Sequence, residues 1–302
     1  MHGTRWGVGV VVAAVIAGCG GQPEPGVTSG GDALDTQGPR GQPEPPMLGI
    51  HWARGQAKPG GGGSPQLVWH GGEIMTSSAV QAVYWGPSWA SASYQGDKVS
   101  GLATLYGGFG GSRYMGTNTE YTGTNGQVGA GVSYGGAVFD TSATPRHAPR
   151  TSDVAAAVCR NVSNPVANGY YPVYTDLPRG HAGYCAWHSY GSCNGVPVQF
   201  AFFFDLAGDP GCDPGSNVAG QSQALAALAN VSGHELSEAV TDPRNGGWWD
   251  ASGAENADKC AWTFDGDVTL SNGSTWKIQG NWSNAAYTAG TGYASGGCIQ
   301  GN

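Results

Sequence analysis

The sequence predicts an α+β fold: one domain with a mixed β-sheet, one long helix and a loop-rich C-terminal part tied by disulfides. Three observations support this prediction. Strand-like segments come first, one long helical pattern follows them, and only short strand-like pieces come after it. Six cysteines lie in the predicted domain. Residues 67–302 are enough to bury one sizeable core.

Strands are expected where β-branched and aromatic residues cluster between glycines and prolines. These segments are residues 79–85, 128–139, 170–175 and 198–204, with two shorter ones at 268–270 and 275–279. The segment 198–204 is so apolar that we expect both of its faces to be buried.

Helices are expected at residues 99–106, at 151–160 and from 221 to about 241. The second begins with Thr and Ser, which cap helix N-termini. The third is the strongest, because its apolar residues recur at helical spacing and Pro243 ends it. Those residues are Leu225, Leu228, Ala229, Leu236 and Val240.

The N-terminus has the pattern of an export signal. Arg5 precedes the apolar run Val8–Ile16, which is too short to span a bilayer, since spanning takes roughly 20 apolar residues. The run ends in Ile-Ala-Gly-Cys19, which resembles the lipobox of bacterial lipoproteins. We therefore expect residues 1–18 to be a signal peptide and Cys19 to be lipidated, which would anchor the exported chain to a membrane of the cell envelope or surface. The alternative is an ordinary secretory signal with a chance cysteine.

Residues 19–66 are predicted to be a disordered tether between the lipidated cysteine and the domain, which would then span residues 67–302. The tether is rich in Gly and Pro and repeats the pentapeptide Gly-Gln-Pro-Glu-Pro at 21–25 and 41–45. It has few large apolar residues, so burial cannot offset the entropy that ordering would cost.

The composition argues against nucleic acid as a partner. Only 11% of the residues are charged, and the net charge is −8. The partners we expect are the membrane, through Cys19, and an extracellular peptide or polysaccharide.

An even number of cysteines in an exported chain predicts up to three disulfides. The candidates are Cys159, Cys185, Cys193, Cys212, Cys260 and Cys298. We favour Cys260–Cys298, which would tie the C-terminal end to the site region, and Cys185–Cys193, which would close a short loop. A cysteine metal site is the weaker alternative, because no Cys-x-x-Cys pair is present.

The long helix carries the main candidate site. His234 and Glu238 are four residues apart, so they project from one face of the helix. This is the spacing at which zincin helices present two metal ligands, with the intervening Glu235 as the general base. Zn²⁺ would produce a nucleophile from water at neutral pH, and Glu235 would accept the water proton.

Glu238 stands where the common His-Glu-x-x-His motif has its second histidine. A carboxylate is an acceptable zinc ligand, but it also makes Mn²⁺ or Ca²⁺ possible. Glu255 is the preferred third ligand, because zincins often take it from a segment after the helix. The alternatives are His188, Asp242 and Asp258.

A purely structural role for the same helix remains open. Amphipathic helices with one histidine and two glutamates are common, and buried carboxylates need partners of some kind. A hydrogen-bonded network of Glu238, Asp242 and Arg244 would satisfy them without a metal.

Several segments of the chain, in order, resemble the plant Exordium (phosphate-induced protein) family and its bacterial relatives. The specific part joins the block around His234-Glu-Leu-Ser-Glu238 to Trp248-Trp-Asp250 and Glu255-Asn-Ala-Asp258-Lys-Cys260. Weaker parts are His70–Thr76, Tyr84-Trp-Gly86 and Cys185-Ala-Trp-His188. The resemblance implies a secreted protein in which His-Glu-x-x-Glu is the family's own pattern. It implies no particular activity.

We therefore expect a zincin-like domain that hydrolyses peptides or similar amides. The rival is a non-catalytic extracellular module that binds polysaccharide or protein, in which the same residues hold a structural metal or a hydrogen-bond network. The two interpretations differ at Glu235. A hydrolase needs this carboxylate free beside the ligands, whereas a structural site would engage it in hydrogen bonds.

Overall fold

The computed structural model describes Gly3, residues 44–56 and residues 65–302. The predicted signal peptide, apart from Gly3, therefore lies outside the described residues, as do Cys19 and most of the predicted tether.

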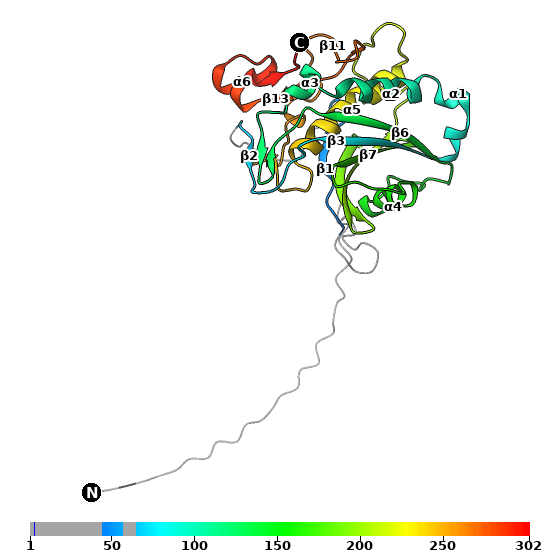
Figure 1. The fold of residues 1–302 in the computed structure, drawn as a ribbon, viewed down its shortest axis with the longest axis horizontal. Coiled ribbons are helices and arrows are strands. Elements are labelled where there is room, and N and C mark those ends of the chain that lie inside the picture. The colour runs from blue at the N-terminus through cyan, green and yellow to red at the C-terminus, as the bar shows by residue number, and fades with distance from the viewer. Residues whose placement is uncertain (1–2, 4–43, 57–64) are drawn as a thin grey trace. The chain divides into compact units, whose positions relative to one another are not determined.

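A six-stranded mixed sheet organises the domain (Figure 1), in the order β1-β8-β9-β7-β3-β6. The parallel strands β6, β3, β7 and β9 form one side. β8 pairs antiparallel with β9, and β1 pairs antiparallel with β8. The bounds are β1 Leu48–Trp52, β3 Ser78–Trp85, β6 Val132–Asp140, β7 Gly169–Pro178, β8 Tyr184–Cys193 and β9 Val196–Asp205.

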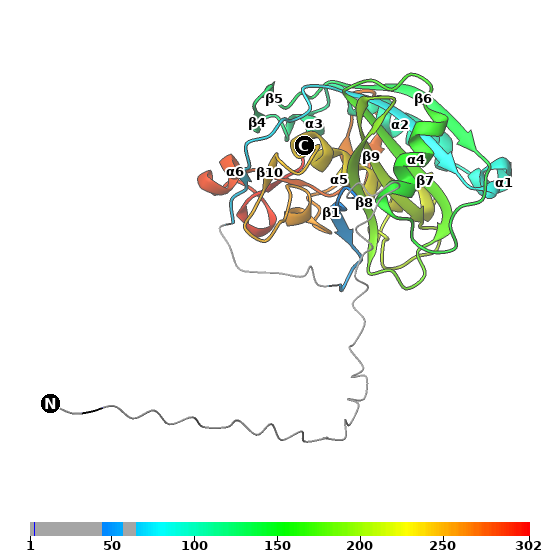
Figure 2. The same cartoon turned by 90° about the horizontal axis from the view of Figure 1, so that it is seen from below.

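Helices cover both faces of the sheet (Figures 1 and 2). The long helix α5, Gln223–Thr241, packs against β1, β8 and β9, and α2, Lys98–Phe109, lies beside it against β6. On the other face α4, Thr151–Asn161, packs on β7, β8 and β9. Because β9 lies between α5 and α4, residues Val198 to Phe204 are buried on both faces, as their apolar sequence predicts.

Short elements complete the fold. The remaining helices are α1 Ala92–Gln95, α3 Arg113–Gly116, α6 Asn284–Ala289 and the 3₁₀ turns η2 Pro87–Ala90, η3 Asp258–Cys260 and η4 Ala294–Gly296. The remaining strands form two-residue pairs, namely β2 Val68–Trp69 with β10 Trp248–Trp249, β4 Thr122–Gly123 with β5 Gly126–Gln127, β11 Val268–Thr269 with β12 Thr275–Trp276, and β13 Asn281–Trp282 with β14 Cys298–Ile299. Most of them lie in the C-terminal part, which is rich in loops as expected.

The predicted α+β class, the mixed sheet and the long helix are confirmed, and three disulfides are present. Two strands of the six-stranded sheet were not expected. One is β8, and the other is β1, which falls inside the predicted tether. The domain therefore includes residues 44–56 rather than beginning at 67. Leu48, His51 and Ala53 are buried in it, so this short apolar stretch has enough contacts to offset its ordering.

The disulfides join Cys159 to Cys193, Cys185 to Cys212 and Cys260 to Cys298. The predicted Cys260–Cys298 bond is confirmed, and the predicted Cys185–Cys193 bond is wrong. Both of the latter cysteines lie on β8, one near each end. A strand rises about 3.3 Å per residue, so their Cα atoms are too far apart for a disulfide, which needs less than about 7 Å.

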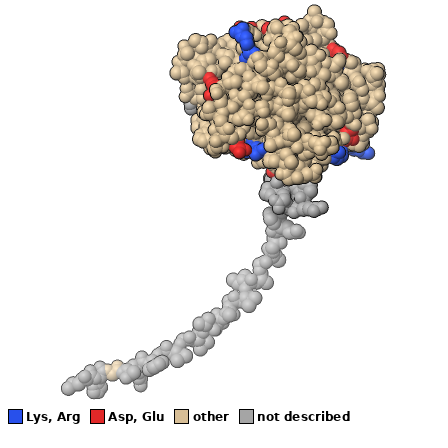
Figure 3. Space-filling view, in the orientation of Figure 1, with Lys and Arg blue, Asp and Glu red and all other residues tan. Residues whose placement is uncertain are grey.

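Charged side chains are sparse on the face seen in Figure 3. Within the described ranges 44–56 and 65–302, no helix has the length and apolarity that a membrane span requires.

Candidate metal centre

Helix α5 is buried along nearly its whole length. It begins at Ser222, whose hydroxyl accepts the N–H of Leu225 at 3.1 Å, and it ends at Asp242, whose Oδ1 accepts the N–H groups of Gly246 and Gly247. The sheet covers one side of the helix and the C-terminal part contacts another. His234, Glu235 and Glu238 are therefore fully buried on a rigid element.

Two groups of potential ligands meet at Glu238. His188, Glu238 and Glu255 form the first, and His234, Glu238 and Asp258 form the second. Within each group the ligand atoms lie within 4.8 Å of one another. The predicted ligands His234, Glu238 and Glu255 thus divide between two groups, and the alternatives His188 and Asp258 complete them.

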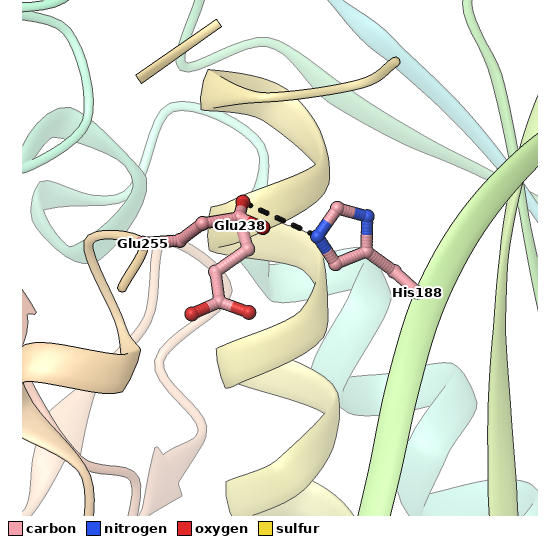
Figure 4. Close-up of side chains that lie close together, drawn as sticks. All are labelled: His188, Glu238 and Glu255. Atoms are coloured by element: carbon pink, nitrogen blue, oxygen red, sulfur yellow. Dashed lines mark hydrogen bonds and ion pairs between the residues drawn. The ribbon is translucent and has the colours of Figure 1, made fainter. Parts of the chain in front are cut away.

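The first group joins three separate parts of the fold (Figure 4). His188 comes from β8, Glu238 from α5 and Glu255 from the loop between β10 and η3. Nε2 of His188 lies 3.3 Å from Oε2 of Glu255, and both residues are buried. One imidazole nitrogen and two carboxylates form a donor set that suits Zn²⁺.

The second group contains buried polar atoms that lack hydrogen bonds. Nε2 of His234 lies 3.0 Å from Oε2 of Glu238, which is an ion-pair distance, but neither atom forms a hydrogen bond of good geometry among the described residues. Asp258 lies further away, with its Oδ1 3.9 Å from the same nitrogen, and its backbone N–H donates to Oε1 of Glu238 at 2.8 Å. Unpaired buried polar atoms are costly, and a cation is one way to satisfy them.

The backbone of Gly49 on β1 packs directly against the first group. Its φ is +47°, and a Cβ atom there would lie 1.9 Å from Oε2 of Glu238 and 2.7 Å from Nε2 of His188. Any side chain at position 49 would therefore collide with both ligands. The donor set of the first group suits a cation, since its ligand atoms lie within 4.8 Å of one another, and the backbone of Gly49 covers the group on this side.

Gln279 fixes the tautomer of His234. Its Oε1 accepts the backbone N–H of Trp262 at 3.2 Å and its Nε2 donates to the carbonyl of Ala257 at 2.8 Å, so the amide cannot turn over without losing both bonds. The same Nε2 lies 3.0 Å from Nδ1 of His234, which must accept a hydrogen bond. Neutral His234 then carries its proton on Nε2, where a metal would otherwise bind.

His188 is constrained less strongly. Its Nε2 lies 3.3 Å from Oε2 of Glu255 and would donate to that oxygen when no metal is bound. Its Nδ1 makes no hydrogen bond among the described residues, so a metal at Nε2 could leave the proton on Nδ1 without breaking a bond there. Burial, and then the neighbouring His234, lower the pKa of His188 to about 3, so the imidazole is neutral at physiological pH. A neutral imidazole is the form that binds a metal, and the geometry favours His188 over His234 as the histidine ligand.

Glu235 is buried beside these groups and belongs to neither. Neither of its carboxyl oxygens forms a hydrogen bond of good geometry among the described residues, although the backbone N–H of His51 lies close enough to lower its pKa. Burial, and then the charges of Glu238 and Asp258, raise the pKa of Glu235 well above its ordinary value. Burial also raises the pKa of Glu238. These raised pKa values show that ionising the carboxyl groups is costly here, and a bound cation would reduce that cost.

A cleft of about 420 Å³ borders the site, but His188, Glu235 and Glu238 do not line it. Its polar end contains Glu255, Asp258 and Asp242, and its walls are mostly apolar. The wall residues are Met47, Leu48, Gly49, Ile50, Trp52, Asn245, Trp249 and Gly253. Asp242, the remaining predicted alternative, borders this cleft but lies outside both ligand groups and caps the end of α5.

Three site residues were missed by the sequence analysis. Gly49 and His51 lie in the predicted tether, and Gln279 ends a segment predicted only as a short strand. The ring of His51 lies 4.1 Å from that of His234, and its Nε2 is 3.0 Å from Oε1 of Gln279. The apolar run Met47-Leu-Gly-Ile-His-Trp52 was the available signal, since the surrounding sequence is rich in Gly and Pro.

Comparison of the chain with models of protein families, with characterised proteins and with solved structures found no match.

Proposed function

We propose that this chain is an exported, lipid-anchored, metal-dependent hydrolase of peptides or similar amides. His188, Glu238 and Glu255 would hold the metal, with Zn²⁺ as the first choice, and Glu235 would be the general base. The export and the anchor rest on the lipobox-like sequence that ends at Cys19.

The observation that carries this proposal is the carboxyl group of Glu235. It is buried next to the ligand groups, and no side chain among the described residues forms a hydrogen bond with either oxygen, although the backbone N–H of His51 lies close enough to lower its pKa. A purely structural network would be expected to engage such a group, because an unsatisfied buried carboxyl destabilises the fold. Unpartnered buried groups with shifted pKa values are typical of catalytic sites.

Each part of the site has a role under this proposal. When bound, Zn²⁺ would polarise the substrate carbonyl and supply a nucleophile at neutral pH. The charge of the cation would lower the pKa of Glu235, which could then accept a proton and pass it to the leaving amine. Trp52 and Trp249 line the cleft and would pack against the substrate.

The resemblance to the Exordium family and the zincin-like arrangement belong to the same proposal. They account for a His-Glu-x-x-Glu helix followed by Glu-x-x-Asp-x-Cys in one chain. They do not specify a substrate. The aromatic and aliphatic walls of the cleft restrict the substrate only to peptides or similar chains that fit between them.

A non-catalytic binding module is the second candidate, and two observations favour it. The backbone of β1 at Gly49 lies directly against Glu238 and His188, where a catalytic metal would need an open position. Gln279 also engages His234 in a hydrogen-bond network that needs no metal.

The substitution Glu235→Gln separates the two candidates. Glutamine has nearly the same shape and leaves the metal ligands intact, so bound zinc and the melting temperature should stay close to those of the parent. Cleavage of a quenched fluorescent peptide library should fall by about 100-fold or more, because a positioned general base contributes about 10²–10⁴-fold. Glu73→Gln, on an exposed carboxylate, is the matched control. Unchanged cleavage in Glu235→Gln, or no cleavage by the zinc-loaded parent, would favour the binding module.

A further inference from the structure

β1 lies on the edge of the sheet in the position that an added strand would take. It pairs antiparallel with β8, with Leu48 opposite His188, His51 opposite Ala186 and Trp52 opposite Tyr184. The register shifts on both sides of His51, whereas β8 and β9 pair without a shift over eight successive residues. β8 therefore pairs less regularly with β1 than with β9.

The path of β1 crosses the candidate metal centre at Gly49. The missing side chain lets the backbone lie against Oε2 of Glu238 and the ring of His188. Among the described glycines, Gly55 on the same segment also has a positive φ, +77°, but a Cβ there would meet nothing within 4 Å. Of these two glycines, only Gly49, which lies against Glu238 and His188, is required by the lack of space for a side chain.

β1 also supplies much of the cleft. Met47, Leu48, Gly49, Ile50 and Trp52 line it, opposite Trp249, Glu255 and Asp258. Without these residues the cleft would extend to His188 and Glu238, which β1 now covers.

Main-chain groups of the segment make many of its contacts. The carbonyl of Pro46 accepts a hydrogen bond from the hydroxyl of Ser189 at 2.8 Å, and that of Trp52 accepts one from the indole of Trp262 at 2.9 Å. The N–H of Ala53 donates to Gly183 at 2.9 Å. Contacts of this kind hold an extended chain through its backbone, and the buried side chain of His51 adds contacts with Gln279 and His234.

We propose that the site binds an extended peptide as an added antiparallel strand on β8, with a glycine over Glu238 and His188, and that β1 is the chain's own occupant of this position. Main-chain bonds to β8 would provide the affinity, and the absence of room beside Glu238 would select glycine. A peptide supplied from outside would have to compete with a tethered strand, whose effective concentration is about millimolar.

This inference rests on the proposed function in its choice of site, but it is tested by binding alone. The full-length chain is compared with Gly49→Ala and Gly55→Ala variants, using a fluorescently labelled synthetic peptide of residues 44–56 and fluorescence anisotropy. In Gly49→Ala the added methyl group prevents β1 from lying along β8, so the peptide should bind saturably at micromolar concentration. The parent and Gly55→Ala should bind at least tenfold more weakly, and a peptide that itself carries Gly49→Ala should not bind to any of the chains.

Circular dichroism of each variant completes the test. A folded Gly49→Ala chain that does not bind the peptide would overturn the inference, as would equal binding by all three chains. Loss of folded structure in Gly49→Ala alone would also overturn it, because β1 would then be an integral strand and not an exchangeable ligand. Peptide cleavage is scored separately: binding without cleavage would refute the hydrolase and leave the binding mode intact.

Discussion

At the residue scale, Glu238 accepts a backbone hydrogen bond that a metal-binding histidine at this position could not accept. Its Oε1 accepts the backbone N–H of Asp258, and its Oε2 faces the imidazoles of His188 and His234. A histidine that bound a metal through one nitrogen would carry a proton on the other, and that N–H would meet the N–H of Asp258. The departure from His-Glu-x-x-His therefore fits the surroundings of this helix.

Asp140 gives the chain an acid-sensitive contact away from the site. Burial alone would raise the pKa of Asp140, but the hydrogen bonds that it accepts outweigh burial and lower this pKa to about 2. The donors are Ser142, Arg160 and Asn161. Because the folded-state pKa lies below the unfolded value of 3.8, this stabilisation is present above pH 4 and is lost as the pH falls toward 2.

Asp140→Asn should therefore lower the free energy of unfolding at pH 7 by about 1–2 kcal/mol. The difference from the parent should vanish near pH 2. Urea denaturation at several pH values measures this, with exposed Asp267→Asn as the control. A difference that stayed constant between pH 7 and pH 2 would contradict the assignment.

Sequence could identify most of the candidate site residues but not their grouping. Helical periodicity places His234, Glu235 and Glu238 together, because one helix carries all three. The choice between His188 and His234 depends on a hydrogen bond from Gln279, which is 45 residues away from His234 in sequence. No local pattern encodes such a contact.

At the element scale, two disulfides allow a matched comparison. Cys260–Cys298 closes a separation of 38 residues and Cys159–Cys193 one of 34, so each should stabilise the fold by about 3–4 kcal/mol. Only the first lies next to the site, since η3, Asp258–Cys260, carries a candidate ligand.

Replacing both cysteines of either pair by serine should thus lower stability by similar amounts, as measured by urea denaturation. Zinc titration of the folded variants should distinguish the two double-serine variants by their affinity for zinc. The Cys260/Cys298 variant should bind zinc at least about tenfold more weakly, as expected when support around a metal site is lost. Equal zinc affinity in the two variants would show that the disulfide does not position the ligand.

Strands and helices differed in how well sequence predicted them. The regular helical spacing in α5 and the continuous apolar run in β9 each gave a signal that matched the structure. β8 gave a weaker signal, because Tyr184–Cys193 mixes polar and small residues and is stabilised by its partners β1 and β9. Its pairing is non-local, which composition does not reveal.

At the scale of the whole molecule, residues 44–56 change the account of how the chain is built. Sequence composition assigned them to a tether, yet they form the edge strand beside the candidate site and cover its ligands. Composition averages over many residues, so it hides a short apolar stretch such as Met47–Trp52 within a Gly- and Pro-rich region. The site thus draws on segments from β1 to Gln279.

The central claim, that Glu238 belongs to a metal site, is tested most directly by elemental analysis of the purified full-length chain. After loading with zinc and removal of the excess, the parent and Glu73→Gln should each retain roughly one equivalent. Glu238→Gln should retain none while its circular dichroism stays unchanged, because the amide oxygen can still accept the N–H of Asp258. A parent without zinc, or a Glu238→Gln chain that keeps it, would contradict the claim.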